Sequence, residues 1–212
     1  MRYSRDASEF DRAITFVDAT FAVALTLLIT TLEVDDKPSS FSSLSALSDA
    51  VGAQFIAFAI AFAVIATYWL ANHRMVAKFV AIDTPTIVAH LCLIAAIVVL
   101  PFSTASVGDP DVADLPLPTV LMAVSIAAVS ALHTLVWVVA CRSGLLDHTP
   151  TSGEWREMVI NGLAPAVVFL ASVPIAYLVS PVAARVSWLS LLAVNPGVGA
   201  LTARARRLRG EG

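Results

Sequence analysis

Polar side chains interrupt the first long apolar stretch of the chain, residues 13–34. Asp18 is the acid that lies well inside this stretch, and Thr20, Thr26 and Thr30 add hydroxyl groups along it. A charged side chain deep in a membrane span costs roughly 2.5–3.5 kcal/mol on insertion scales, so such an acid needs a partner or a role. Two kinds of chemistry are open: a hydrogen-bonded network that fixes helix packing, or a site for a proton or a cation.

Two histidines, His90 and His133, lie inside later apolar stretches. Each fits a hydrogen-bonded interhelical histidine better than a metal ligand, because no His-x-x-x-His spacing accompanies it. Cys92 and Cys141 also lie in apolar stretches, so we interpret them as packing residues rather than as a disulfide. An enzyme would need a nucleophile, a base or metal ligands that converge, and the sequence shows no such cluster. We therefore expect no enzymatic activity, no metal and no cofactor.

The composition is that of an integral membrane protein. Apolar residues make up 58% of the 212 residues and charged residues only 14%, whereas soluble domains carry about 25% charged residues. The mean hydropathy of +0.82 agrees with this. The chain is best divided into membrane spans of about 20 residues each. The expected fold is an all-α membrane protein with one transmembrane domain, residues 1–212.

Six apolar stretches can be drawn as membrane spans, joined by short loops rich in Ser, Pro and Asp. They cover approximately residues 13–34, 51–71, 85–107, 118–141, 157–179 and 182–199. The sixth is the weakest, because Arg185 lies near its start and Asn195-Pro196-Gly197 ends it early.

The basic residues favour an orientation with both termini in the cytoplasm. With six spans, the outer segments hold only Lys37 and Arg185. The inner segments hold Arg2, Arg5, Arg12, Arg74, Lys78, Arg142, Arg156, Arg204, Arg206, Arg207 and Arg209. This sorting follows the positive-inside rule, and an odd number of spans would move the basic tail to the other side.

The first span has two different faces at about 100° per residue. One face carries Ala19, Val23, Thr26, Leu27, Thr30 and Val34, whereas the opposite face carries Phe21, Leu25, Leu28 and Leu32. Asp18 points nearer to the bulky apolar face. Small residues and threonines on the first face allow either a close approach of two helices or an aqueous path along it.

Several polar residues lie at the same membrane level as Asp18. They belong to the start of the first span and the end of the second: Arg12, Trp69, Asn72, His73 and Arg74. Asp18 can therefore find its partner on a neighbouring helix of its own subunit.

These motifs resemble those of the bacterial transmembrane protein 175 family, whose members are homologues of the lysosomal potassium channel. That family opens its first helix with Arg-x-x-x-Phe-Ser-Asp, and residues Arg12, Phe16 and Asp18 match this motif, with Val17 in place of the serine. The segment "YWLANHR", residues 68–74, resembles the Trp-and-His end of the family's second helix. The stretch 100–104 resembles the Leu-Pro-Phe-x-Thr part of its third helix.

The resemblance implies a six-helix subunit that assembles as a homotetramer around a central pore lined by the first helix. By resemblance, the constriction lies at Val23, Leu27 and Thr30, with Thr26 near its narrow part, and no Thr-Val-Gly-Tyr-Gly filter is present. The family often has Ile at the Val23 position and Leu at the Thr30 position. The structural network that the family motif implies comprises Arg12, Phe16, Asp18, Trp69 and His73.

From the residues and the resemblance together, we expect a potassium-permeable cation channel with a hydrophobic gate. It would be a multi-pass protein of the bacterial inner membrane, with the bilayer, potassium ions and its own copies as partners and no nucleic acid. The alternative is a proton-coupled secondary transporter that uses Asp18, His90 and His133. Such a transporter predicts an acid near the bilayer midplane and broken helices at repeated positions.

Overall fold

The computed structural model describes residues 1–33 and 41–190 of the protein. The long helices are α1 (Ser8–Leu27), α2 (Leu44–Val76), α3 (Thr84–Ile97), α4 (Leu100–Gly108), α5 (Pro116–Arg142) and α6 (Ser152–Leu178). The short elements are the 3-10 helices η1 (Leu28–Thr31) and η3 (Trp188–Ser190), α7 (Pro181–Ser187), and the strands β1 (Arg2–Ser4) and β2 (Ala81–Asp83). The described part is therefore helical apart from one small sheet, as the sequence predicted.

Five helical segments of the described residues are long and apolar enough to cross a membrane. They are α1 with η1, α2, α3 with α4, α5, and α6, and they correspond to the first five predicted spans. The sixth predicted span, 182–199, is described only through residue 190, where α7 and η3 pack against α6. Residues 191–199, the basic tail and Val34 lie outside the described residues.

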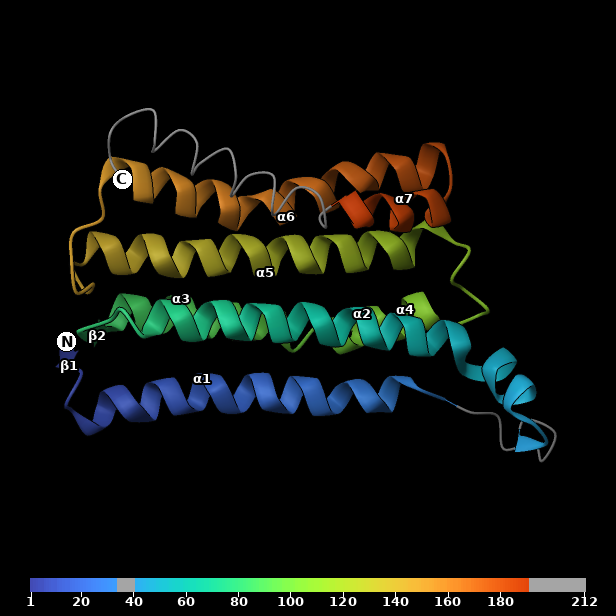
Figure 1. Ribbon diagram of the computed structural model, residues 1–212, viewed down its shortest axis with the longest axis horizontal. Coiled ribbons are helices and arrows are strands. Elements are labelled where there is room, and N and C mark those ends of the chain that lie inside the picture. Colours follow the sequence, from blue (N-terminus) through green and yellow to red (C-terminus); the bar gives the residue numbers. More distant parts are fainter. Residues whose placement is uncertain (34–40, 191–212) are drawn as a thin grey trace.

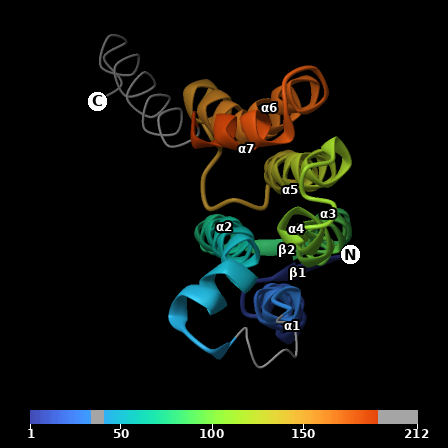
Figure 2. The same cartoon turned by 90° about the vertical axis from the view of Figure 1, so that its right-hand side faces the viewer.

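The long helices lie side by side in layers (Figure 1), and the view along them separates the layers clearly (Figure 2). α1 forms one outer layer by itself. α2 and the α3–α4 segment form the next layer, α5 follows, and α6 with α7 closes the opposite side. Because α1 packs only on the α2, α3 and α4 side of the bundle, its other side has no neighbouring helix in the described part of the chain.

The third membrane segment consists of two helices, whereas the sequence analysis drew one continuous span there. α3 ends at Ile97 and α4 begins at Leu100. Pro101 has no N–H to donate to the Ile97 carbonyl, and its ring would clash with that carbonyl in a straight helix. Next to the break, the hydroxyls of Ser103 and Thr104 donate to the Leu100 carbonyl, 3.1 and 2.8 Å away. The buried hydroxyls at the break are thereby hydrogen-bonded within α4.

A small structure that we call the clasp, residues 2–5, 77–83 and 143–147, joins three segments at the end of the bundle where α1 begins. In it, β1 pairs antiparallel with β2. The N–H of Val80 donates to the Leu145 carbonyl, 2.8 Å away, and the Arg5 guanidinium donates to the carbonyls of Ala77 and Phe79. The segment that leads into α1 is thus tied to the α2–α3 and α5–α6 loops.

α5 and α6 approach each other closely at Gly162. The hydroxyl of Ser130 on α5 donates to the Gly162 carbonyl on α6, 2.5 Å away. A Cβ atom at Gly162 would collide with the Thr134 hydroxyl oxygen on α5. The absence of a side chain at this position therefore sets how closely the two helices pack.

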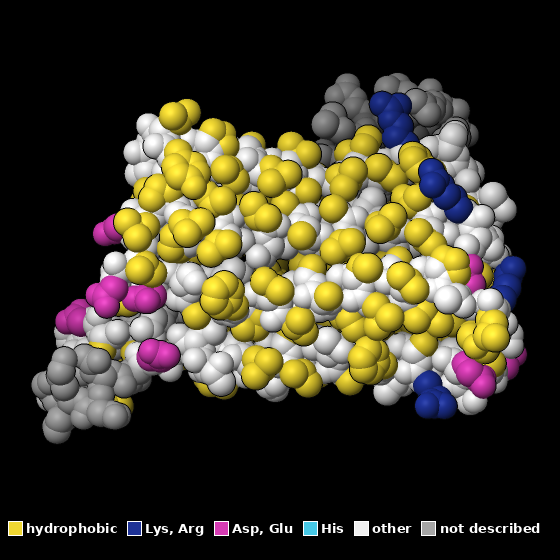
Figure 3. Space-filling view, turned by 180° about the vertical axis from the view of Figure 1, so that it is seen from behind, with side chains coloured by type: hydrophobic (Ala, Val, Ile, Leu, Met, Phe, Trp, Pro, Cys, Tyr) yellow, Lys and Arg dark blue, Asp and Glu magenta, His cyan; other side chains and the backbone are white. Residues whose placement is uncertain are grey.

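Hydrophobic side chains cover the surface between the two ends of the bundle (Figure 3). Exposed examples from different helices are Phe55, Ile56, Leu91, Val167 and Leu170. The Lys and Arg side chains visible in this view gather at one end. A soluble monomer does not expose an apolar band of this extent, so this surface suits contact with lipid.

Candidate functional site

α1 divides into a buried face and an exposed face. The buried side chains are Phe10, Val17, Phe21, Ala24 and, at the start of η1, Leu28. On the other side, Val23 and Leu27 are 52% and 44% exposed, and Thr26 and Thr30 beside them are exposed as well. We call these four residues, of which Thr30 lies on η1 directly after α1, the exposed face of α1. The burial agrees with the two faces predicted from the spacing of residues in the first span.

The hydroxyls of Thr26 on α1 and Thr30 on η1 donate their protons to backbone carbonyls three residues earlier in the chain. Thr26 donates to the Val23 carbonyl, 2.8 Å away, and Thr30 donates to the Leu27 carbonyl, 2.7 Å away. A hydroxyl has one proton to donate and two lone pairs that accept. Once the proton is engaged in this way, the oxygen offers only acceptor lone pairs to its surroundings. These oxygens therefore suit contact with a cation or with the protons of water.

Behind the exposed face, Asp18 is joined to α2. The indole N–H of Trp69 donates to the Asp18 carboxylate, with 3.1 Å between Nε1 and Oδ1. The rings of Trp69 and His73 lie 5.8 Å apart, centroid to centroid. The structure thus brings together three of the five residues that the sequence placed in a network. The Trp69–Asp18 hydrogen bond crosses from α2 to α1, whereas the Trp69–His73 ring contact lies within α2.

The other two network residues lie on the surface of α1. Phe16 is 56% exposed, and Arg12 is also exposed. In the described part of the chain no hydrogen bond or ion pair joins Arg12 to Asp18. Val17, at the position where the family motif has serine, is buried in the core and contributes apolar packing. The carboxylate therefore relies on Trp69 for its described hydrogen bond.

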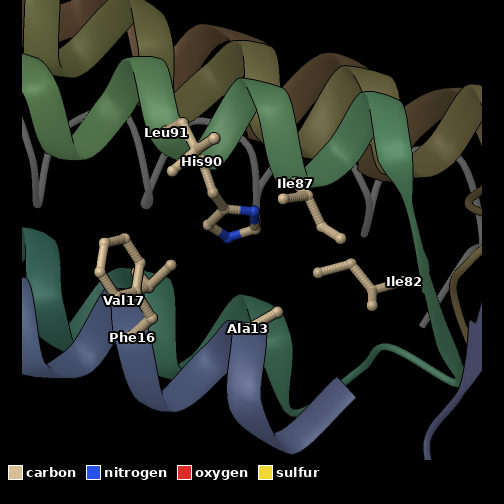
Figure 4. Close-up of a pocket in the computed structure, with 7 residues that line it drawn as sticks. All are labelled: Ala13, Phe16, Val17, Ile82, Ile87, His90 and Leu91. Atoms are coloured by element: carbon tan, nitrogen blue, oxygen red, sulfur yellow. The ribbon is translucent and has the colours of Figure 1, made fainter. Parts of the chain in front are cut away.

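A small apolar pocket lies between the start of α1 and the start of α3 (Figure 4). Its volume is about 40 Å³, and it is lined by Ala13, Phe16, Val17, Ile82, Ile87, His90 and Leu91. His90 contributes the imidazole ring, whose Nδ1 lies 3.0 Å from the Thr86 carbonyl oxygen. Because aliphatic and aromatic groups form the rest of its wall, the pocket does not suit a hydrated ion.

The intramembrane histidines do not assemble a metal centre. His90 is buried, and the His133 ring packs edge-on against Tyr68, with 5.9 Å between the ring centroids. Among the described residues, no group of three or more His, Cys, Asp or Glu side chains could hold a metal ion. The two histidines are therefore packing residues, but the expected hydrogen bonds between helices are not seen in the described part of the chain: His90 bonds within α3, and Nε2 of each ring has no hydrogen-bond partner there.

At the far end of the exposed face, Glu33 follows η1 and is exposed. Its backbone N–H donates to the side-chain oxygen Oε1 of Gln54 on α2, 2.7 Å away. The sequence analysis did not single out Glu33. The signal was present in the sequence, since Glu33 is an acidic residue at the end of the predicted first span, residues 13–34.

Long apolar helices in layers, together with an apolar outer surface, define a multi-pass helical membrane protein. Residues 12–101 match the family described as the endosomal/lysosomal potassium channel TMEM175. The chain is similar to that family over these residues, which confirms the resemblance predicted from its motifs. Because this is a family of channels, the prediction that the chain is not an enzyme is also confirmed.

Individual relatives match over most of the chain. A potassium channel from Streptomyces collinus is 24% identical over 180 residues, which are 82% of this chain and 85% of the relative. The crystal structure of a lysosomal potassium-selective channel TMEM175 homologue from Chamaesiphon minutus has a TM-score of 0.70 at 17% identity and covers 92% of this chain and 99% of its own. A crystal structure of a variant of the potassium channel MtTMEM175 has a TM-score of 0.66 at 18% identity and covers 95% of each chain. The two structures establish a shared fold.

Proposed function

We propose that this protein is a potassium-permeable channel whose pore is formed by the exposed face of α1 from four copies of the chain. The observation that carries this proposal is the position of α1 at the edge of the subunit. One side of the helix is buried, whereas Val23, Thr26, Leu27 and Thr30 on the other side have no described neighbour. Copies of α1 arranged around an axis would cover this side and enclose a path.

The chemistry of the exposed face suits a hydrophobic constriction. Val23 and Leu27 are one helical turn apart, about 6 Å along the axis. Two stacked apolar rings make a short segment that excludes water, and dewetting of such a constriction gates ion flow. The acceptor oxygens of Thr26 and Thr30 lie next to it and provide contacts where an ion regains its water. Potassium gives up water more readily than sodium, so the neck favours potassium.

The hydrogen bond between Trp69 and Asp18 supports the orientation of this face. It holds the back of α1 against α2 of the same subunit, so Asp18 serves packing rather than conduction. The relatives named as potassium channels agree with the proposed permeant ion. The proton-coupled transporter, the alternative from the sequence, is not favoured by these comparisons.

The test is ion flux in liposomes that contain the purified full-length protein, combined with the mass of the detergent-solubilised oligomer. We expect a four-fold oligomer and a potassium flux that follows the imposed membrane potential with no coupled solute. Protein-free liposomes are the control. A stable monomer that conducts, or a flux that requires a proton gradient, would overturn the proposal.

A further inference from the structure

The proposed neck does not by itself distinguish cations from anions. Rings of Val23 and Leu27 resist any ion that must shed its hydration shell, whatever the sign of its charge. Thr26 and Thr30 offer acceptor oxygens, but a hydroxyl group has no net charge. Cation channels commonly obtain charge selectivity from rings of acidic side chains near the path. A potassium channel with this neck therefore needs a fixed negative charge close to the exposed face of α1.

Glu33 occupies the position where such a charge would act. It lies just beyond η1, after the extended residue Leu32, and its side chain is exposed. Within residues 1–33 and 41–190, its carboxylate takes part in no hydrogen bond or ion pair. Asp114, which lies at the same end of the bundle, belongs to the α4–α5 loop. Glu33 is therefore the first acidic residue in the chain after the exposed face of α1.

The backbone of Glu33 is held in place by the neighbouring helices. Its N–H donates to Gln54 Oε1, 2.7 Å away, which ties the residue to α2. Gln54 is itself packed against α4, since a Cβ atom on Gly108 would lie 3.0 Å from the Gln54 Cα. η1, which precedes Glu33, also packs against α2 and α4. The base of the Glu33 side chain is thus fixed by two helices of its own subunit.

We propose that Glu33 sets the charge selectivity of the channel, an inference that rests on the proposed function. In a four-fold assembly, four Glu33 carboxylates surround one mouth of the path, raise the local potassium concentration and repel anions. Clefts with charges of one sign raise local counter-ion concentrations and association rates by about 10–10³-fold. Salt screens this effect over about 30 Å at 0.01 M but over only about 3 Å at 1 M. The contribution of Glu33 is therefore largest at low salt.

The experiment measures the potassium-to-chloride permeability ratio and the potassium conductance of the full-length protein in planar bilayers, at low and at high KCl. Glu33→Gln removes the charge but keeps the size of the side chain and the backbone hydrogen bond. We expect the ratio and the conductance to fall on the order of tenfold at low salt and to change little at about 1 M. Glu33→Asp retains the charge and is expected to behave as the wild type.

Asp114→Asn is the matched control, because it removes one negative charge at the same end but away from the exposed face. We expect it to leave the permeability ratio unchanged. The inference is wrong if Glu33→Gln keeps the wild-type ratio at low salt, or if Asp114→Asn lowers the ratio equally. It is also wrong if only a combined Asp35→Asn and Asp36→Asn variant loses selectivity. If the wild-type protein conducts potassium, each of these results leaves the proposed channel function intact. A wild-type protein that shows no potential-driven potassium flux contradicts the proposed channel function itself.

Discussion

The indole of Trp69 donates a hydrogen bond to the carboxylate of Asp18, and this contact joins α2 to the back of α1. It places an intramembrane acid beside a neutral donor, within one subunit and behind the face that carries Val23 and Leu27. A carboxylate in this position contributes to helix packing. Its loss should therefore appear first in stability and assembly.

Asp18→Leu should lower the thermal stability of the protein in detergent by about 1–3 kcal/mol, because the indole N–H then loses its acceptor. Asp18→Asn should be milder, since its amide oxygen can still accept that hydrogen bond. Thermal unfolding of both variants, at equal protein concentration, measures the difference. Trp69→Phe, which removes the donor, is expected to resemble Asp18→Leu. A fully stable Asp18→Leu oligomer with altered ion selectivity would instead assign Asp18 to the pore.

Leu27→Ser should increase cation conductance and weaken the discrimination between potassium and sodium, because a hydroxyl on the exposed face wets the proposed neck. Potassium and sodium flux into liposomes measures both effects at matched protein levels. Leu25→Ser is the control, since Leu25 packs against the core from the other side of α1. That variant should mainly impair folding. If Leu25→Ser changes selectivity while Leu27→Ser does not, the pore has been assigned to the wrong face.

Gly162→Ala should destabilise the packing of α5 against α6. The added methyl group collides with the Thr134 hydroxyl, and overpacking of a tight interface typically costs about 1–3 kcal/mol. Thermal unfolding measures the loss, and a second substitution, Thr134→Ala, should restore part of it. Gly52→Ala is the matched control, because its Cβ would meet only the Ser48 hydroxyl oxygen at 3.7 Å. Equal losses from the two glycine substitutions would contradict the close approach at Gly162.

Asp83 should make the stability of the clasp depend on pH. Burial alone would raise the pKa of its carboxyl group, but hydrogen-bonding groups of Thr86 and Ser143 outweigh burial and lower that pKa below the ordinary value of 3.8. The ionised carboxylate therefore stabilises the folded state above pH 3.8, and this contribution is lost as the pH falls through the lowered pKa. Asp83 Oδ1 also accepts the Thr86 N–H at the start of α3, 2.9 Å away.

We expect the melting temperature of the wild type to fall more steeply on acidification than that of Asp83→Asn, in which position 83 cannot titrate. Asparagine still caps a helix, so both proteins should keep the same fold. They should differ in how steeply the melting temperature depends on pH. Melting curves from neutral pH to below pH 3.8 provide the measurement. Asp114→Asn, an exposed position at the other end of the bundle, controls for general charge effects. Parallel curves for wild type and Asp83→Asn would contradict a role for the Asp83 carboxylate.

The two faces of α1 could be predicted from the sequence because amphipathic spacing is a property of one helix alone. The pairing of Asp18 with Trp69 could also be anticipated, since antiparallel spans bring the start of one helix level with the end of the next. The clasp could not, because strands of three residues show no periodicity and depend on contacts between distant segments. The break before Pro101 had a visible signal, but its apolar surroundings suggested a continuous span. The pore role of Val23, Thr26, Leu27 and Thr30 stays a prediction.

The direction of the threonine hydroxyl protons has a consequence for water. Because Thr26 and Thr30 donate to the carbonyls of Val23 and Leu27, water beside these residues can only donate to them. In a pore built as proposed, such waters point their protons at the wall and their oxygens at the axis. A cation that leaves the apolar rings then meets water oxygens already turned toward it and regains its hydration there. The helix would orient its own solvent by a hydrogen bond made away from the path.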